Sequence, residues 1–72
     1  MPPATAAKPY KVVPGLTLHQ ARDLLRRLGA VERPAYRTTD RTLHWSGVLK
    51  IWAQLAPVDA GYTLSLYRGC PC

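Results

Sequence analysis

The sequence predicts a small α+β domain in which one amphipathic helix packs on a sheet of three to four strands, in the order β-α-β-β. Two observations carry this prediction: a capped segment with helical periodicity near the N-terminus, and alternating apolar and polar residues in the second half. The 72 residues suffice for one domain with one modest core. We expect that domain over residues 9–68, between a flexible Pro/Ala-rich leader over residues 1–8 and a C-terminal tail over residues 69–72.

The helix is the most clearly predicted element, and it should cover residues 18–28. Thr17 is a good N-cap, and Gln20 three residues later completes a capping box. Gly29 supplies the C-terminal stop, because glycine enters the left-handed conformation at little energetic cost. Apolar side chains recur at helical spacing and form one stripe, which consists of Leu18, Ala21, Leu24, Leu25 and Leu28. This stripe predicts a helix with one face buried against a sheet.

Two of the predicted strands contain or adjoin a proline. Residues 10–13 form a short strand candidate, which Pro14-Gly15 should close as a turn. Residues 31–38 are rich in β-formers but contain Pro34, which cannot donate to a strand ladder. We therefore expect residues 31–38 to form at best an edge or irregular strand.

Residues 47–55 fit two patterns. Four apolar residues alternate with Lys50, Trp52 and Gln54, which suits a half-buried strand. A helical stripe with Ser46 as its cap fits the same residues, but their Val, Ile and Trp content favours the strand. A turn over residues 57–61 and a last strand over residues 62–67 should follow.

The charge of the chain favours binding to an acidic partner. Ten Lys and Arg residues against four Asp and Glu residues give a formal net charge of +6, and nine of the ten lie between Lys11 and Arg68. Such an excess attracts polyanions and acidic protein faces. An enclosed substrate pocket would hollow out the one small core. The sequence also offers no catalytic pair and no Gly-rich phosphate loop, so we expect a binding protein and not an enzyme.

No feature of the sequence predicts export, a membrane span or a metal site. Residues 1–7 lack the basic start and apolar run of a signal peptide, and no segment approaches the roughly 20 apolar residues that span a bilayer. Cys70 and Cys72, with only His19 and His44 elsewhere, give no zinc spacing. We therefore expect a monomer in the bacterial (host) cytoplasm, with reduced thiols, no cofactor and no bound metal.

Residues 12–29 resemble the opening of a PASTA domain. In that family a Val-rich strand leads to Gly-Leu-Thr, here Gly15-Leu16-Thr17, then to an alanine four residues later, here Ala21, and to a Leu-rich helix. Residues 53–57 and 60–66 are similar to the third strand, Pro-containing turn and last strand of the family. The resemblance implies a βαββ-type fold and the binding of cell-wall fragments.

A second likeness is one of general character. A small, basic chain without catalytic groups is similar to the phage proteins that bind and inhibit a host machine, of which RNA polymerase is the commonest large target. This likeness implies a regulator of transcription.

The outer side of the predicted helix carries the first candidate binding surface. His19, Arg22 and Arg26 follow one another at spacings of three and four, so they line one side of the helix, called the basic ridge below. Arg22 and Arg26 repel each other, which a purely structural surface would readily avoid. Arg27 lies alongside, where Asp23 can offset part of its charge. The alternative to a contact surface for carboxylates or phosphates is an ordinary solvated helix face.

The second candidate surface lies on the predicted sheet. Lys50 and Trp52 should share one sheet face, with Tyr67 and Arg68 on the neighbouring strand. Aromatic residues interleaved with basic ones can stack on bases or anchor a protein partner. Core packing is the alternative for Trp52, and it is the favoured interpretation for Trp45.

Three function classes follow. The first is a phage-type regulator that binds an acidic surface of a bacterial macromolecular machine, such as an RNA polymerase subunit, and modulates transcription. The second is direct binding of DNA or RNA through the basic ridge, and the third is a PASTA-like module for cell-wall fragments.

Overall fold

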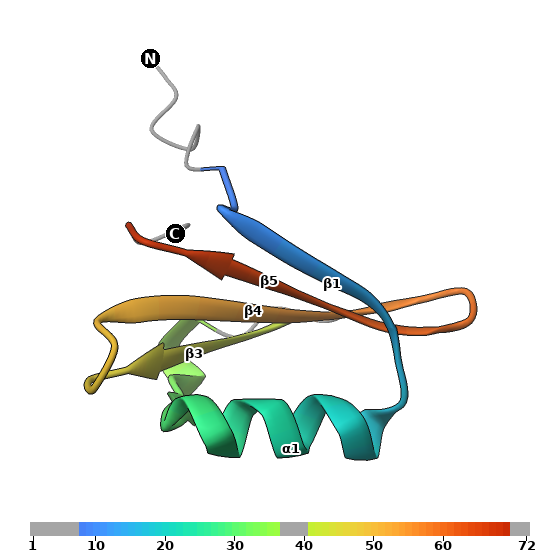
Figure 1. Cartoon of the computed structure of the whole chain (residues 1–72), viewed down its shortest axis with the longest axis horizontal. Helices are drawn as coiled ribbons and strands as arrows, with labels where there is room; N and C mark the ends of the chain where they lie inside the picture. The colour runs from blue at the N-terminus through green and yellow to red at the C-terminus, as the bar shows by residue number, and fades with distance from the viewer. Residues whose placement is uncertain (1–7, 37–40, 70–72) are drawn as a thin grey trace.

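One helix crosses one face of a five-stranded antiparallel sheet in the computed structural model, which describes residues 8–36 and 41–69 (Figure 1). The strands lie in the order β1-β5-β4-β3-β2. Their bounds are β1 (Lys11–Leu16), β2 (Ala30–Glu32), β3 (Thr42–Ser46), β4 (Ile51–Val58) and β5 (Gly61–Tyr67). The single-helix α+β prediction is confirmed, but the sheet has five strands, not three to four. No helix within the described residues is both long and apolar enough to cross a membrane.

The helix α1 (Leu18–Leu28) has the predicted bounds and caps. The Gln20 amide N–H donates to the Thr17 hydroxyl at 3.1 Å, and the Thr17 amide N–H donates to Gln20 Oε1 at 2.9 Å. Gly29 adopts the left-handed conformation with φ of 71°. The predicted capping box and the glycine stop are therefore both present.

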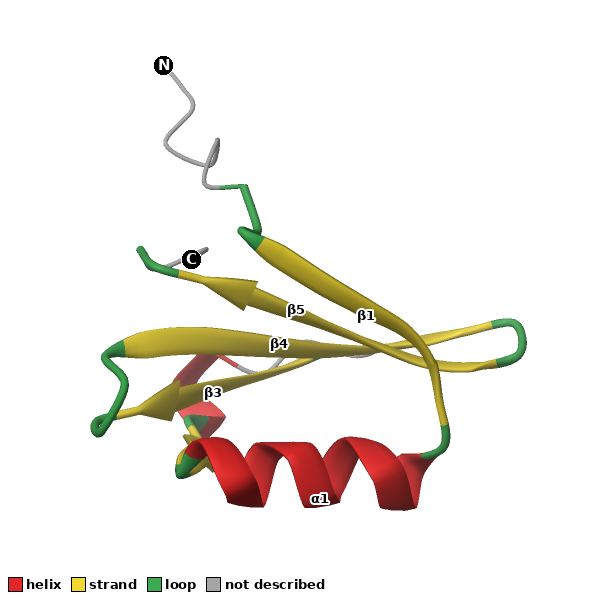
Figure 2. Ribbon diagram, viewed as in Figure 1, coloured by secondary structure: helices red, strands yellow, loops and turns green. Residues whose placement is uncertain are grey.

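The core lies between α1 and the sheet, which form two layers (Figure 2). Its buried members are Leu25, Ile51, Ala53, Leu64 and Leu66. Of the predicted apolar stripe, Ala21 and Leu25 are buried, Leu24 and Leu28 are half-buried, and Leu18 in the first turn is exposed. The helix thus contributes its central turns to the core more than its first one.

The strand predicted over residues 10–13 extends further than expected. Pro14-Gly15 does not close the strand but lies inside β1, where the register with β5 shifts between Val13 and Leu16. Gly15 has φ of 70°, the left-handed conformation that a β-bulge uses. Because β1 is an edge strand, it tolerates both the bulge and a proline without a backbone donor.

The strand predicted over residues 31–38 is shorter than expected. Of its described residues, only Val31 and Glu32 belong to a strand, β2, which pairs with β3 at the sheet edge. Pro34 then begins a short 3-10 turn, η2 (Pro34–Tyr36), because proline has no N–H to continue the ladder. The edge character predicted from Pro34 is confirmed.

Residues 47–55 divide into a turn and a strand. Residues 47–50 form the turn between β3 and β4, and the helical alternative is wrong. β4 continues through Pro57 to Val58, so the turn expected over residues 57–61 is reduced to Asp59 and Ala60. The proline fits because β3 begins at Thr42, opposite Leu55, and beyond that point β4 pairs only with β5 among the described residues.

Candidate functional site

The basic ridge lies on the exposed side of α1. His19, Arg22 and Arg26 are all exposed, whereas Ala21 and Leu25 point into the core from the opposite side of the helix. The amphipathic stripe fixes this orientation, because burying the leucines leaves the residues between them in solvent. The structure therefore places the three ridge residues together, as their spacing predicted.

Acidic side chains within the described part of the chain do not neutralise the two arginines of the ridge. Asp23 pairs with Arg27, with 3.1 Å between the Asp23 Oδ2 and Arg27 Nε atoms. Arg22 and Arg26 form no ion pair with any residue that the structure describes, and the first turn of α1 contains no acidic residue. Two guanidinium groups one helical turn apart are thus available to a partner.

The helix C-terminus offsets part of the repulsion between these charges. Arg26 and Arg27 lie in the last turn of α1, where the helix dipole is negative. This favourable contribution is about 0.3–1 kcal/mol per exposed charge at low ionic strength. The dipole acts only over the last turn, so it does little for Arg22.

The sheet face that points away from α1, called the outer face below, carries a row of aromatic residues. Trp45, Trp52 and Tyr67 are direct partners across β3, β4 and β5. Trp52 points outward because its neighbours Ile51 and Ala53 face the helix. The rings of Trp45 and Trp52 are 4.9 Å apart between centroids and inclined by 49°. The favoured interpretation of Trp45 as a core residue is wrong, since Trp45 is half-buried and packs on Trp52 on the face away from α1.

The members of this row differ in how much ring they offer to a partner. Tyr67 is only 9% exposed, and its hydroxyl donates to Gln54 Oε1 at 3.1 Å. Trp45 and Trp52 are half-buried. Tyr67 therefore packs within the sheet and offers little surface to a partner. The two tryptophans provide the accessible aromatic surface of the row.

Lys50 and Arg68 do not share the outer face with Trp52 and Tyr67. Lys50 lies in the turn between β3 and β4 with φ of 56°, so the side-chain alternation of a strand does not apply to it. Arg68 follows the end of β5, and its guanidinium carbon lies 4.7 Å from the centroid of the Tyr10 ring. The prediction of one sheet surface with both aromatic and basic residues is therefore wrong in this detail.

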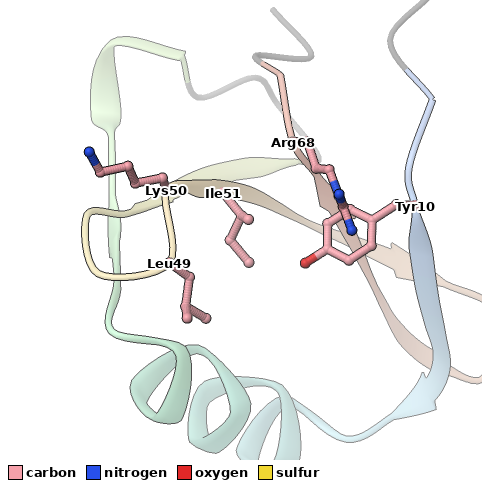
Figure 3. Close-up of a pocket in the computed structure, with 5 residues that line it drawn as sticks. All are labelled: Tyr10, Leu49, Lys50, Ile51 and Arg68. Atoms are coloured by element: carbon pink, nitrogen blue, oxygen red, sulfur yellow. The ribbon is translucent and has the colours of Figure 1, made fainter.

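These two basic residues instead border a hollow at one end of the sheet. The hollow has a volume of about 350 Å³ and is lined by Tyr10, Leu49, Lys50, Ile51 and Arg68 (Figure 3). Sequence reasoning missed Tyr10 and Leu49, because only the pairing of β1 with β5 and of β4 with β5 brings these segments together. The sole local signal is the run of apolar residues in the turn.

His44 is a buried titratable group on the helix side of β3. It is 9% exposed, and its Nε2 lies 2.9 Å from the Thr42 hydroxyl. Burial lowers the pKa of His44 below its usual value of 6.5, although Glu32 opposite in β2 acts to raise it. The imidazole is consequently neutral at pH 7 and does not add to the charge of the ridge.

Within residues 8–36 and 41–69, no group of three or more His, Cys, Asp or Glu side chains could hold a metal ion. Cys70 and Cys72 lie outside the described residues, as do residues 1–7 of the predicted leader. No family model matches the chain, and comparisons with curated proteins and with solved structures found no match. The surfaces of the molecule are therefore the basis for arguing its function.

Proposed function

We propose that this chain is a non-enzymatic regulator that binds an acidic surface of a bacterial macromolecular machine through the basic ridge of α1. The observation that supports this most is the exposure of Arg22 and Arg26, one turn apart and without an acidic partner among the described residues. The formal net charge of +6 adds a long-range attraction to acidic surfaces.

The ridge would recognise carboxylates by charge and by geometry. Each guanidinium is planar and can form two parallel hydrogen bonds with one carboxylate. Side chains four residues apart on a helix are about 5–6 Å apart at their Cβ atoms. Arg22 and Arg26 would therefore suit two acidic residues with similar spacing, such as those on consecutive turns of an acidic helix.

RNA polymerase is the first candidate partner, and modulation of transcription is the proposed outcome. The support is the general likeness of a small basic chain to phage proteins that inhibit host machines. The charge of the ridge is compatible with an acidic subunit surface and would mainly set the rate of association.

Capture from a bacterial lysate, with and without nuclease, tests the proposal. The wild type should retain RNA polymerase subunits after nuclease treatment, and the double variant Arg22→Glu/Arg26→Glu should lose them. The matched control is Lys8→Glu/Lys11→Glu, which changes the net charge equally at two exposed positions, one shortly before β1 and one at its first residue. Equal capture by both double variants would contradict the role of the ridge, and nuclease-sensitive capture would favour nucleic acid.

A second candidate function is binding of single-stranded nucleic acid on the outer face. The support is the pair of half-buried tryptophans, Trp45 and Trp52, since aromatic rings on a sheet can stack on bases. Such binding would weaken steeply with salt, and Trp52→Ala would reduce it where Arg22→Glu/Arg26→Glu would not. Fluorescence anisotropy with a labelled oligonucleotide distinguishes the two functions.

A further inference from the structure

The hollow at the end of the sheet has two chemically different walls. Figure 3 shows the Tyr10 ring and the Arg68 side chain on one side, and Leu49 and Ile51 on the other. Lys50 lies at the rim, and its ammonium group points away from the space between Ile51 and Tyr10 (Figure 3). One wall is thus aromatic and cationic, and the other is aliphatic.

Arg68 lies over the Tyr10 ring and has no acidic partner among the described residues. Its guanidinium carbon lies 4.7 Å from the centroid of the Tyr10 ring, within the range of a cation–π interaction. Arg68 forms no ion pair with any other described residue. An arginine stacked by its face on a ring keeps the N–H groups at its edge available for a carboxylate.

The aliphatic wall leaves apolar surface in contact with water. Leu49 is 51% exposed although it belongs to a turn that is fixed by hydrogen bonds at Ser46, while Ile51 below it is 8% exposed. Covering such surface is favourable, at about 25 cal/mol per Å² of apolar area. A ligand that only paired with Arg68 would leave this contribution unused.

We propose that the hollow binds a carboxylate attached to an apolar body. The carboxylate would pair with the Arg68 guanidinium, and the apolar body would lie between Tyr10 and the Leu49–Ile51 wall. The volume of about 350 Å³ is at the small end of ligand sites and suits a single aromatic or aliphatic acid, or the last residue of a peptide. This site is separate from the basic ridge, so it does not depend on the function proposed above.

Titration of the full-length protein in two-dimensional ¹H–¹⁵N NMR spectra tests the site with matched pairs of probes. The first pair is 4-phenylbutanoate and 4-phenylbutanamide, and the second is the peptide acetyl-Ala-Ala-Ala-Leu with a free or an amidated C-terminus. Small ligands on open sites bind in the millimolar range. The acids should shift the amide signals of Leu49, Ile51 and Arg68, and each amide should bind about tenfold more weakly because a charge-assisted hydrogen bond is lost.

Two variants assign the roles of the walls. Arg68→Gln should weaken binding of the acids about tenfold and abolish their preference over the amides, because Gln cannot pair with the charge. Leu49→Ser should weaken acid and amide alike. Arg33→Gln is the control. It removes the same charge as Arg68→Gln, at an exposed position outside the hollow, and should leave the affinities for acid and amide unchanged.

The relative affinities of the acids and amides decide whether the hollow is a carboxylate site. Stronger binding of the free peptide acid than of phenylbutanoate would identify a peptide C-terminus as the natural source, and the reverse would identify a free acid. Equal binding of acids and amides to the wild type would overturn the proposal, as would shifts that avoid the hollow or no shifts at the solubility limit. Retained preference for the acids in Arg68→Gln would overturn it too.

Discussion

The hydroxyl of Ser46 donates a 2.6 Å hydrogen bond to the main-chain carbonyl oxygen of Leu28, the last residue of α1. The Ser46 hydroxyl oxygen in turn accepts a 3.2 Å hydrogen bond from the Leu49 amide N–H. One buried hydroxyl, 1% exposed at the residue level, thus satisfies a helix-end carbonyl and fixes the turn between β3 and β4. The helix that carries the basic ridge is tied to the turn that forms one wall of the hollow.

Replacing this hydroxyl should destabilise the domain. Ser46→Ala leaves the Leu28 carbonyl and the Leu49 N–H without this partner, so we expect a loss of about 1–3 kcal/mol in the free energy of unfolding. Urea denaturation measures it. Ser65→Ala on β5 is the control, because that half-buried serine faces away from α1, and it should cost less than about 0.5 kcal/mol. Similar losses in both variants would contradict the linking role of Ser46.

Gly61 should not tolerate a side chain. A Cβ at this position would lie 2.5 Å from the main-chain oxygen of Leu16, and φ is 146°, which L-residues rarely adopt. Gly61→Ala should therefore lower stability by at least about 1–3 kcal/mol, because the clash is with backbone and the conformation is strained. Gly69→Ala has open space around it and should be neutral. Thermal unfolding of the two variants checks this, and a neutral Gly61→Ala would show that β1 and β5 are spaced more widely.

Replacing Lys50 with glycine should stabilise the domain. A φ of 56° costs a non-glycine residue about 1–2 kcal/mol in the folded state. Glycine avoids this cost, but its greater flexibility in the unfolded chain cancels about half of the gain. We expect Lys50→Gly to raise stability slightly and Lys50→Val to lower it clearly. Lys50→Gln controls for the lost charge and should resemble the wild type in denaturant melts. A destabilised Lys50→Gly would indicate that the turn adopts another conformation.

Acid should destabilise the domain through His44. Its pKa is lowered in the folded state by burial, so the unfolded chain binds the proton more tightly. The contribution of the neutral imidazole to the free energy of unfolding is therefore fully present above pH 6.5. It is lost as the pH falls through 6.5 toward the lower folded-state pKa. Denaturation midpoints between pH 7.5 and about pH 5 should show this loss. His44→Gln should flatten the dependence, whereas His19→Gln, which changes an exposed histidine, should retain it.

The helix and its basic ridge could be predicted because their signals are local. Thr17, Gln20 and Gly29 act within one turn of each helix end, and the ridge follows from spacing alone. The bounds of α1 and the exposure of Arg22 and Arg26 were correct for this reason.

The sheet could be predicted only in part because its pairing is decided between distant segments. Pro57 remains in β4 because β3 begins only opposite Leu55 and, among the described residues, Pro57 pairs with β5 alone. Pro14 remains in β1 because a bulge at a sheet edge accommodates it. Neither arrangement can be predicted from the residues next to these prolines. The contact of Arg68 with Tyr10 likewise depends on the register of β1 with β5, so the sequence alone does not bring the two walls of the hollow together.

The rate of association with purified RNA polymerase at low and high salt tests the central proposal most directly. The proposal predicts that Arg22→Glu/Arg26→Glu slows association at least about tenfold at low salt and less at high salt, because screening weakens steering. Lys8→Glu/Lys11→Glu should have a much smaller effect, and circular dichroism should show an intact helix in both variants. Association of the ridge variant at the rate of the control variant, with the fold intact, would contradict the proposed function.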